Sequence, residues 1–134
     1  MTETEIFLSS HGIRPTAVRL LVWREAERQV STFSLNDMEE LLPHMDRSSI
    51  FRALRLFLDH HLLHEINDGT GHQKFCVCRC KDGHHRGHIH FNCLKCGRTY
   101  CLEDYDIPQV DLPEGFTIEE VEYIVKGRCK YCKD

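Results

Sequence analysis

Two CxxC motifs account for the strongest chemical signal in this sequence. They are Cys93–Cys96 and Cys129–Cys132, and 32 residues separate Cys96 from Cys129. Two residues between the cysteines let both thiolates of a motif reach one ion across a tight turn, and four thiolates make a closed tetrahedral site that favours zinc. Redox motifs or buried free thiols are the alternatives. Two motifs in one short chain favour a structural zinc site on Cys93, Cys96, Cys129 and Cys132.

A second set of possible metal ligands surrounds the first motif. His88 and His90 are two residues apart, so in a strand they point to the same face and can share an ion. The remaining candidates are one of Cys76 or Cys78, with His64, Cys101 or Glu103 as a fourth ligand. Thiolate and imidazole suit zinc, whereas ferrous iron more usually has imidazole and carboxylate ligands. The alternative is that some of these cysteines belong to the core.

The composition limits the class of protein. The chain has 134 residues, of which 41% are hydrophobic and 28% charged, as in soluble globular proteins. No apolar stretch is long enough to cross a membrane and the N-terminus does not resemble a secretory signal, so we expect a cytoplasmic protein with no membrane partner. In that compartment eight cysteines, all between Cys76 and Cys132, indicate metal binding rather than disulfides.

The elements that position these residues change in type near residues 67–71. Before this point the chain lacks cysteine and has helical spacing of its apolar residues. The predicted helices cover 3–10, 16–29, a segment capped by Ser34, and 47–60. Two strands, 62–66 and 74–78, then flank a Gly-rich turn and form a hairpin. Helices followed by a hairpin are typical of a winged helix, with the third and fourth helices as the helix-turn-helix.

The C-terminal part is predicted to be mainly β. The expected strands are 88–92, 98–102 and 116–126, and Pro108 and Pro113 make 106–115 extended or irregular. The predicted fold class is therefore α+β, with two domains and a hinge. These are a winged-helix DNA-binding domain over 1–80, a small zinc-binding dimerisation domain over 84–134, and a hinge at about 67–83.

Binding of DNA would depend on a local surface, because the net charge is −4. Residues 1–66 contain seven Arg and no Lys against ten Asp and Glu, which gives 7 − 10 = −3. The fourth helix would enter the major groove. The expected DNA contacts are Arg52 and Arg55, Phe51 against a base, Arg47 and Ser49 near phosphates, and Arg14 and Arg19 on the backbone. The alternative for each arginine is a solvated surface charge.

Four stretches together resemble the ferric uptake regulator family of metal-dependent repressors, over nearly the whole chain. They are Gly12–Arg19, Ser48–Leu54, His88–Gly97 and Gly127–Cys132. The resemblance implies a homodimer with structural zinc in its C-terminal domain and a regulatory metal between the domains. A two-fold dimer would bind double-stranded DNA at a roughly palindromic operator.

Departures from the family pattern indicate which metal is sensed. Phe51 replaces a common Tyr, and residues 31–33 lack the His of iron- and peroxide-sensing members. Cysteines stand where those members have carboxylates, at Cys76 or Cys78 and at Cys101, which resembles the zinc uptake regulators. The family also has a longer helix between the CxxC motifs, which Pro108 and Pro113 disfavour here. The dimer contact is then smaller or built differently.

These observations predict a zinc-responsive transcriptional repressor of metal-homeostasis genes. The second, regulatory metal is expected to be zinc, with iron as the alternative. Within the family, the alternative is a sensor of iron, haem or peroxide. In another class, the alternative is a zinc ribbon that binds protein and not DNA. An enzyme is not expected, because the sequence contains no HExxH motif or deaminase pattern.

Overall fold

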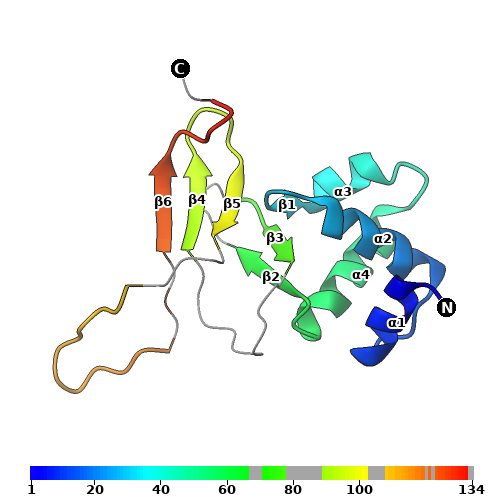
Figure 1. Ribbon diagram of the computed structural model, residues 1–134, viewed down its shortest axis with the longest axis horizontal. Coiled ribbons are helices and arrows are strands. Elements are labelled where there is room, and N and C mark those ends of the chain that lie inside the picture. Colours follow the sequence, from blue (N-terminus) through cyan, green and yellow to red (C-terminus); the bar gives the residue numbers. More distant parts are fainter. Residues whose placement is uncertain (67–70, 78–88, 103–107, 120, 122, 133–134) are drawn as a thin grey trace. The chain divides into compact units, whose positions relative to one another are not determined.

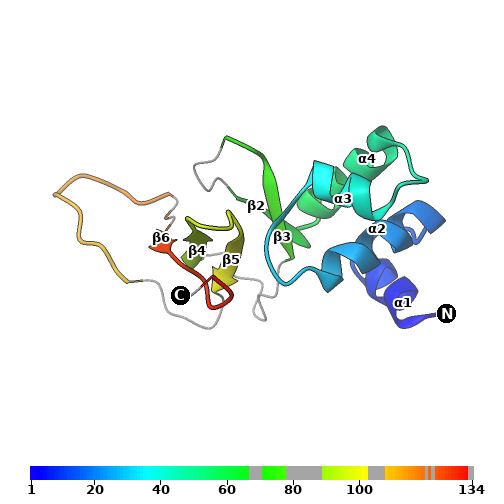
Figure 2. The same ribbon diagram turned by 90° about the horizontal axis from the view of Figure 1, so that it is seen from above.

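The computed structural model describes residues 1–66, 71–77, 89–102, 108–119, 121 and 123–132 (Figures 1 and 2). The chain divides into two compact units, Met1–Cys78 and Arg79–Asp134. Cys78, His88 and Glu103, three of the expected metal ligands, lie outside the described residues. The described part has no helix that is long and apolar enough to cross a membrane.

Unit 1 begins with four helices whose starts are set by side-chain caps. The helices are α1 (Glu3–Ser10), α2 (Ala17–Arg28), α3 (Leu35–Leu41) and α4 (Arg47–Asp59). An N-cap side chain satisfies backbone N–H groups that have no partner within the helix. Thr2, Thr16, Ser34 and Asp46 fill this position, and Ser34, the predicted cap, forms a capping box with Asp37. All four predicted helices are present, and the three with predicted bounds match them to within one residue at each end.

A three-stranded antiparallel sheet completes unit 1. Its order is β1 (Phe33–Ser34), β3 (Lys74–Val77) and β2 (Leu63–Ile66). The predicted hairpin strands are β2 and β3, which pair from Leu63 opposite Val77 to Ile66 opposite Lys74. The sequence did not predict β1, because two residues are too few to show the alternation of a strand. Helices α3 and α4 with this hairpin form the winged helix.

The core of unit 1 lies between the helices and one face of the sheet. Trp23 is the centre of an aromatic group, stacked on Phe7 and edge-on to Phe57 with centroids 5.2 Å away in each case. On α2, Leu21 is 46% exposed, while Trp23 is buried. A single helical pattern does not distinguish the buried stripe from its neighbour when both Leu21 and Trp23 are apolar.

Unit 2 is a three-stranded sheet in the order β5 (Thr99–Leu102), β4 (Ile89–Cys93) and β6 (Tyr123–Gly127). Strand β4 is antiparallel to β5 and parallel to β6. The last strand is shorter than predicted, because residues 116–119 have strand-like alternation but form no strand pairing. Residues 108–119 contain no helix, as Pro108 and Pro113 predicted.

Candidate functional site

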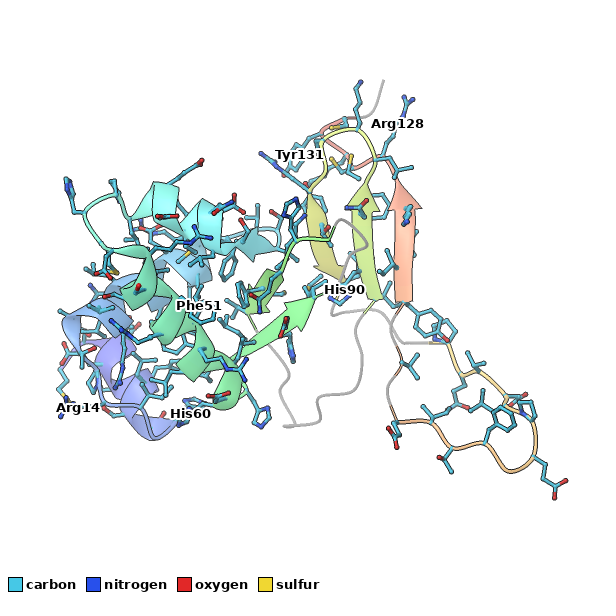
Figure 3. The ribbon with its side chains drawn as sticks, turned by 180° about the vertical axis from the view of Figure 1, so that it is seen from behind. Arg14, Phe51, His60, His90, Arg128 and Tyr131 are labelled. Carbon is cyan, nitrogen blue, oxygen red and sulfur yellow. The ribbon has the colours of Figure 1, made fainter. Side chains whose placement is uncertain are left out.

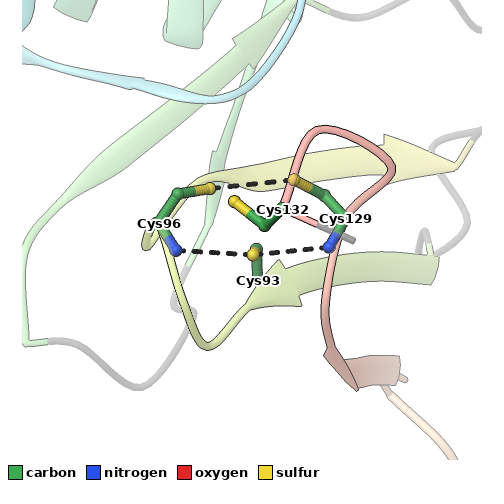
Figure 4. A group of neighbouring side chains, drawn as sticks. All are labelled: Cys93, Cys96, Cys129 and Cys132. Atoms are coloured by element: carbon green, nitrogen blue, oxygen red, sulfur yellow. Dashed lines mark hydrogen bonds between the residues drawn. The ribbon is translucent and has the colours of Figure 1, made fainter. Parts of the chain in front are cut away.

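The four cysteines of the CxxC motifs form one cluster at an end of the unit 2 sheet (Figure 4). Cys93 is the last residue of β4, and Cys129 follows β6 by two residues. Their Sγ atoms and those of Cys96 and Cys132 all lie within 4.8 Å of one another. Parallel pairing of β4 with β6 brings the two motifs together, because Cys93 is in register with Gly127.

The backbone of each motif folds into a tight turn that aims its sulfurs inward. The N–H of Gly97 donates to the carbonyl of Cys93 at 2.8 Å, and the N–H of Cys93 donates to the carbonyl of Arg98 at 2.8 Å. Gly97 has φ +79°, a conformation that side chains with a Cβ disfavour. The N–H of Leu94 donates to the carbonyl of Gly127 at 2.8 Å and joins the two motifs.

Backbone donors favour the thiolate form of the innermost cysteine. The N–H groups of Cys96 and Cys129 each donate to Sγ of Cys93 at 3.4 Å, and they lower the pKa of Cys93 to about 6. Burial and the neighbouring sulfurs raise the pKa of Cys132 to about 12. Four sulfurs this close repel one another as thiolates, and a divalent cation removes that repulsion. The cluster therefore has the chemistry of a metal site with four sulfur ligands.

A buried polar contact supports the strand that carries this cluster. Asn92 precedes Cys93, and its side-chain amide donates to the hydroxyl of Thr99 at 3.0 Å. Thr99 is fully buried and Asn92 nearly so. The sequence analysis missed this pair, because only the register of β4 with β5 places Asn92 opposite Thr99.

The other described candidate ligands form two cross-strand pairs. His64 of β2 is opposite Cys76 of β3 in unit 1, and His90 of β4 is opposite Cys101 of β5 in unit 2. Residues directly opposite in an antiparallel pair share a face of the sheet. His90, labelled in Figure 3, is buried. Each pair therefore presents one imidazole and one sulfur on the same side of its sheet.

The sulfurs of these two pairs differ in oxidation state from the CxxC cluster. Cys76 and Cys101 are disulfide-bonded, whereas Cys93, Cys96, Cys129 and Cys132 are free thiols. A thiolate is the form that binds a metal. Cys76 and Cys101 are therefore available as ligands only after reduction.

The outer face of α4 is the candidate nucleic-acid interface of unit 1. Phe51, labelled in Figure 3, is 42% exposed, and Arg52 and Arg55 are exposed on the same helix. Asp46 caps the helix by accepting from the N–H of Ser49 at 3.2 Å and from its hydroxyl at 2.8 Å. These two donors lower the pKa of the Asp46 carboxyl. The cap occupies the hydroxyl of Ser49, one of the expected phosphate contacts.

The expected DNA-binding arginines differ in their present partners. Arg47 donates to Asn36 at 2.7 Å and forms an ion pair with Glu39 at 2.5 Å. Arg55 forms an ion pair with Asp59 at 3.6 Å. Ahead of α2, the guanidinium of Arg19 donates to the carbonyl of Arg14 at 3.0 Å. Arg47 would have to leave Glu39 to reach a phosphate.

Comparison with known proteins identifies the family. The model of the ferric uptake regulator family matches residues 11–124, which includes both units. The chain belongs to this family. No curated protein matches the chain by sequence.

Solved structures of ferric uptake regulator relatives have the same fold. A zinc uptake regulator complexed with zinc and DNA has 19% identity and a TM-score of 0.66, covering 98% of this chain and 96% of that one. The ferric uptake regulator of Vibrio cholerae has 16% identity and a TM-score of 0.62, covering 95% and 100%. A zinc-bound manganese uptake regulator has 17% identity and a TM-score of 0.61, covering 93% and 98%. These likenesses support the predicted α+β class and the winged helix.

Proposed function

We propose that this chain is a zinc-responsive transcriptional repressor of metal-homeostasis genes and has no enzymatic role. The observation that carries the proposal is α4, the second helix of the helix-turn-helix, with Phe51, Arg52 and Arg55 on its exposed face. An exposed aromatic ring beside two guanidinium groups suits the thymine methyl and the guanine edge in the major groove. The zinc uptake regulator complexed with zinc and DNA has the same fold.

We propose that the four-cysteine cluster holds a structural zinc. Sulfur ligands select zinc over hard cations, and four of them leave no coordination position for water or substrate. The two motifs come from opposite ends of the unit 2 sequence, so the ion would fix the ends of β4 and β6 together. Such an ion would stabilise a small sheet that has few large buried side chains.

We propose that the regulatory metal is held by the imidazole and the reduced sulfur of one of these histidine–cysteine pairs. His90 with Cys101, and His64 with Cys76, provide imidazole and thiolate, which suit zinc better than ferrous iron. Cys78, His88 and Glu103 stay candidate ligands on sequence grounds. Binding shifts a regulator between states only if the metal has different affinities for those states.

We further propose that the regulator binds double-stranded DNA as a homodimer. One α4 offers a short row of base-reading side chains, and two copies related by a two-fold axis would read two half-sites. A roughly palindromic operator is the expected target. Arg47, Ser49, Arg14 and Arg19 are the proposed contacts to the DNA backbone, where cationic and hydroxyl side chains meet phosphates.

The disulfide-bonded state of Cys76 and Cys101 favours a second candidate, an oxidation-responsive regulator of the same family. One peroxide would convert two thiols to a disulfide and two waters, and a cysteine held in a disulfide is lost as a thiolate ligand. The second metal would then leave, while the four free CxxC thiols would keep theirs.

The test combines metal analysis with DNA binding in reductant, before and after mild chelation. We expect two zinc ions per chain, one of which is removed easily together with DNA binding. A Cys101→Ser variant should start with one zinc and bind DNA weakly, and the Cys132→Ser variant should lose the tightly held ion. One tightly held zinc, with DNA binding indifferent to added zinc, would contradict the zinc-sensor proposal.

Loss of the second zinc on peroxide treatment, with recovery in reductant, would favour the oxidation-responsive candidate.

A further inference from the structure

The hydroxyl of Tyr100 is a buried polar group in the unit 2 sheet. Its oxygen is shielded from solvent and makes no hydrogen bond of good geometry with another described group. An unpaired hydroxyl away from water costs free energy, because it has lost the hydrogen bonds that water would give it. Such exceptions in folded proteins commonly have a functional reason. The surroundings of Tyr100 provide one.

Strand register places Tyr100 on the face of the sheet that carries the four-cysteine cluster. Tyr100 of β5 is opposite Phe91 of β4, and Phe91 shares its face with Cys93 two residues later. A Cβ on Gly127 would meet the ring of Phe91 at 3.3 Å, so this ring lies directly over the residue opposite Cys93. Aromatic rings therefore cover the sheet beside the sulfurs, and a hydrogen bond in such an apolar environment is stronger than one in water.

Two groups of the cluster region meet the hydroxyl of Tyr100. They are the sulfur of Cys129, which is buried, and the guanidinium of Arg98, whose side chain is exposed. A guanidinium has N–H donors and no acceptor, so Arg98 can only donate to the tyrosine oxygen. The proton of the hydroxyl is then left for the sulfur of Cys129. The chemistry of the three groups thus sets one direction, from Arg98 through Tyr100 to Cys129.

The charge of the Cys129 sulfur determines how well it accepts this proton. A neutral thiol is a weak acceptor, whereas hydrogen bonds to a charged group are shorter and roughly twice as strong as those between neutral groups. A cysteine that binds a metal does so as the thiolate. The hydrogen bond is therefore expected to be strong in the metal-bound state.

We propose that Tyr100 is a positioning residue of the four-cysteine metal site and that its hydroxyl donates a hydrogen bond to the sulfur of Cys129 when zinc is bound. The inference rests on the proposed structural zinc. Groups that lie behind metal ligands orient those ligands and tune the metal. The bond from Tyr100 holds the Cys129 sulfur in place and stabilises its negative charge, so the ion is held more tightly.

The first experiment measures the dissociation constant of the tightly held zinc in the full chain, by competition with a chromophoric chelator in reductant. Tyr100→Phe keeps the ring and removes the donor, and it should raise this constant about 10- to 100-fold. Tyr131→Phe is the matched control, because Tyr131 lies inside the second CxxC motif and is 66% exposed (Figure 3). The control should leave the constant unchanged.

A second experiment replaces zinc by cobalt, whose sulfur-to-metal charge-transfer absorption reports on the sulfur ligands directly. Cobalt is loaded in reductant, and the loosely held ion is removed by mild chelation. A hydrogen bond lowers the energy of the sulfur electrons, so its loss in Tyr100→Phe should move the charge-transfer band to longer wavelength. The ligand-field bands, which report tetrahedral geometry, should stay where they are. A role in packing alone would not shift the charge-transfer band, since phenylalanine preserves the ring.

The outcomes separate Tyr100 from the metal site itself. If the zinc dissociation constant or the charge-transfer band of Tyr100→Phe equals that of Tyr131→Phe, the proposal for Tyr100 is overturned and the four-cysteine site stands. A shift of the ligand-field bands in Tyr100→Phe also overturns it, because the substitution would then have changed the geometry of the site. A wild type without any sulfur-to-cobalt band would overturn both Tyr100 and the structural zinc.

Discussion

At the scale of residues, the four cysteines of the cluster are not equivalent. Two backbone N–H groups stabilise the thiolate of Cys93, while burial keeps the thiol of Cys132 protonated. The sequence places all four in identical CxxC contexts. The difference arises because the sulfur of Cys93 accepts hydrogen bonds from backbone N–H groups of both motifs. These bonds favour the metal-binding thiolate of Cys93 even without an ion.

Arg52 is the residue whose removal should weaken DNA binding most specifically. A bidentate contact to a base contributes roughly 1–3 kcal/mol, so Arg52→Ala should weaken binding to the operator about 5- to 150-fold. Arg24→Ala is the control, because Arg24 is an exposed arginine on α2 that we place outside the interface. Binding is measured by fluorescence anisotropy with operator and scrambled DNA at one salt concentration.

An equal loss of affinity for operator and scrambled DNA would assign Arg52 to phosphate contact rather than base reading. No loss would remove Arg52 from the interface and shift the expected readout to Phe51 and Arg55.

At the scale of elements, α4 has two separate duties on opposite faces. Its inner face buries Ile50, Ala53, Leu54 and Phe57, and its outer face carries Phe51, Arg52 and Arg55. The capping aspartate fixes where the helix starts, and hence which residues fall on each face. The same burial that stabilises unit 1 thereby holds the outer residues in position for DNA.

Leu54→Ala should lower the free energy of unfolding of unit 1 by roughly 2–5 kcal/mol, because it removes fully buried methyl groups and leaves a cavity. Leu21→Ala on α2 should change it by less than about 0.5 kcal/mol, since Leu21 is 46% exposed. Urea unfolding followed by the fluorescence of Trp23 measures both. Equal effects of the two substitutions would contradict the assigned core.

At the scale of the molecule, the two units depend on different sources of stability. Unit 1 has a continuous core of helical and strand residues, including the aromatic group around Trp23. The described part of unit 2 buries few large apolar side chains and instead gathers four sulfurs. A small domain of this kind usually requires a metal or disulfides.

Removing all zinc should therefore unfold unit 2 and leave unit 1 folded, because metal-binding free energy is folding free energy in such sites. Trp23 is the chain's single tryptophan and is buried in unit 1, so its emission should keep its native wavelength. Backbone amides of β4 and β6 should lose protection from hydrogen exchange at the same time. Exposure of Trp23 together with that loss would show that unit 1 needs the zinc as well.

The sequence by itself determined the local structure of unit 1 and the sulfur ligands of the four-cysteine cluster. Helix starts followed from cap residues such as Ser34 and from apolar spacing, since both depend on neighbours within one or two turns. The two CxxC motifs predicted a four-sulfur group. A two-residue spacing lets both thiolates of one motif bind the same ion, and a second motif completes the tetrahedral site. Pro108 and Pro113 predicted the absence of a helix for the equally local reason that proline lacks the N–H a helix requires.

Only the tertiary structure decided which distant residues meet. The pairing of His90 with Cys101 and of His64 with Cys76 follows from strand register, and a one-residue slip would place the two members of each pair on opposite faces. The exposure of Leu21 and the ion pair of Arg47 with Glu39 likewise depend on packing between segments. Such contacts join residues far apart along the chain, so no local pattern of residue types specifies them.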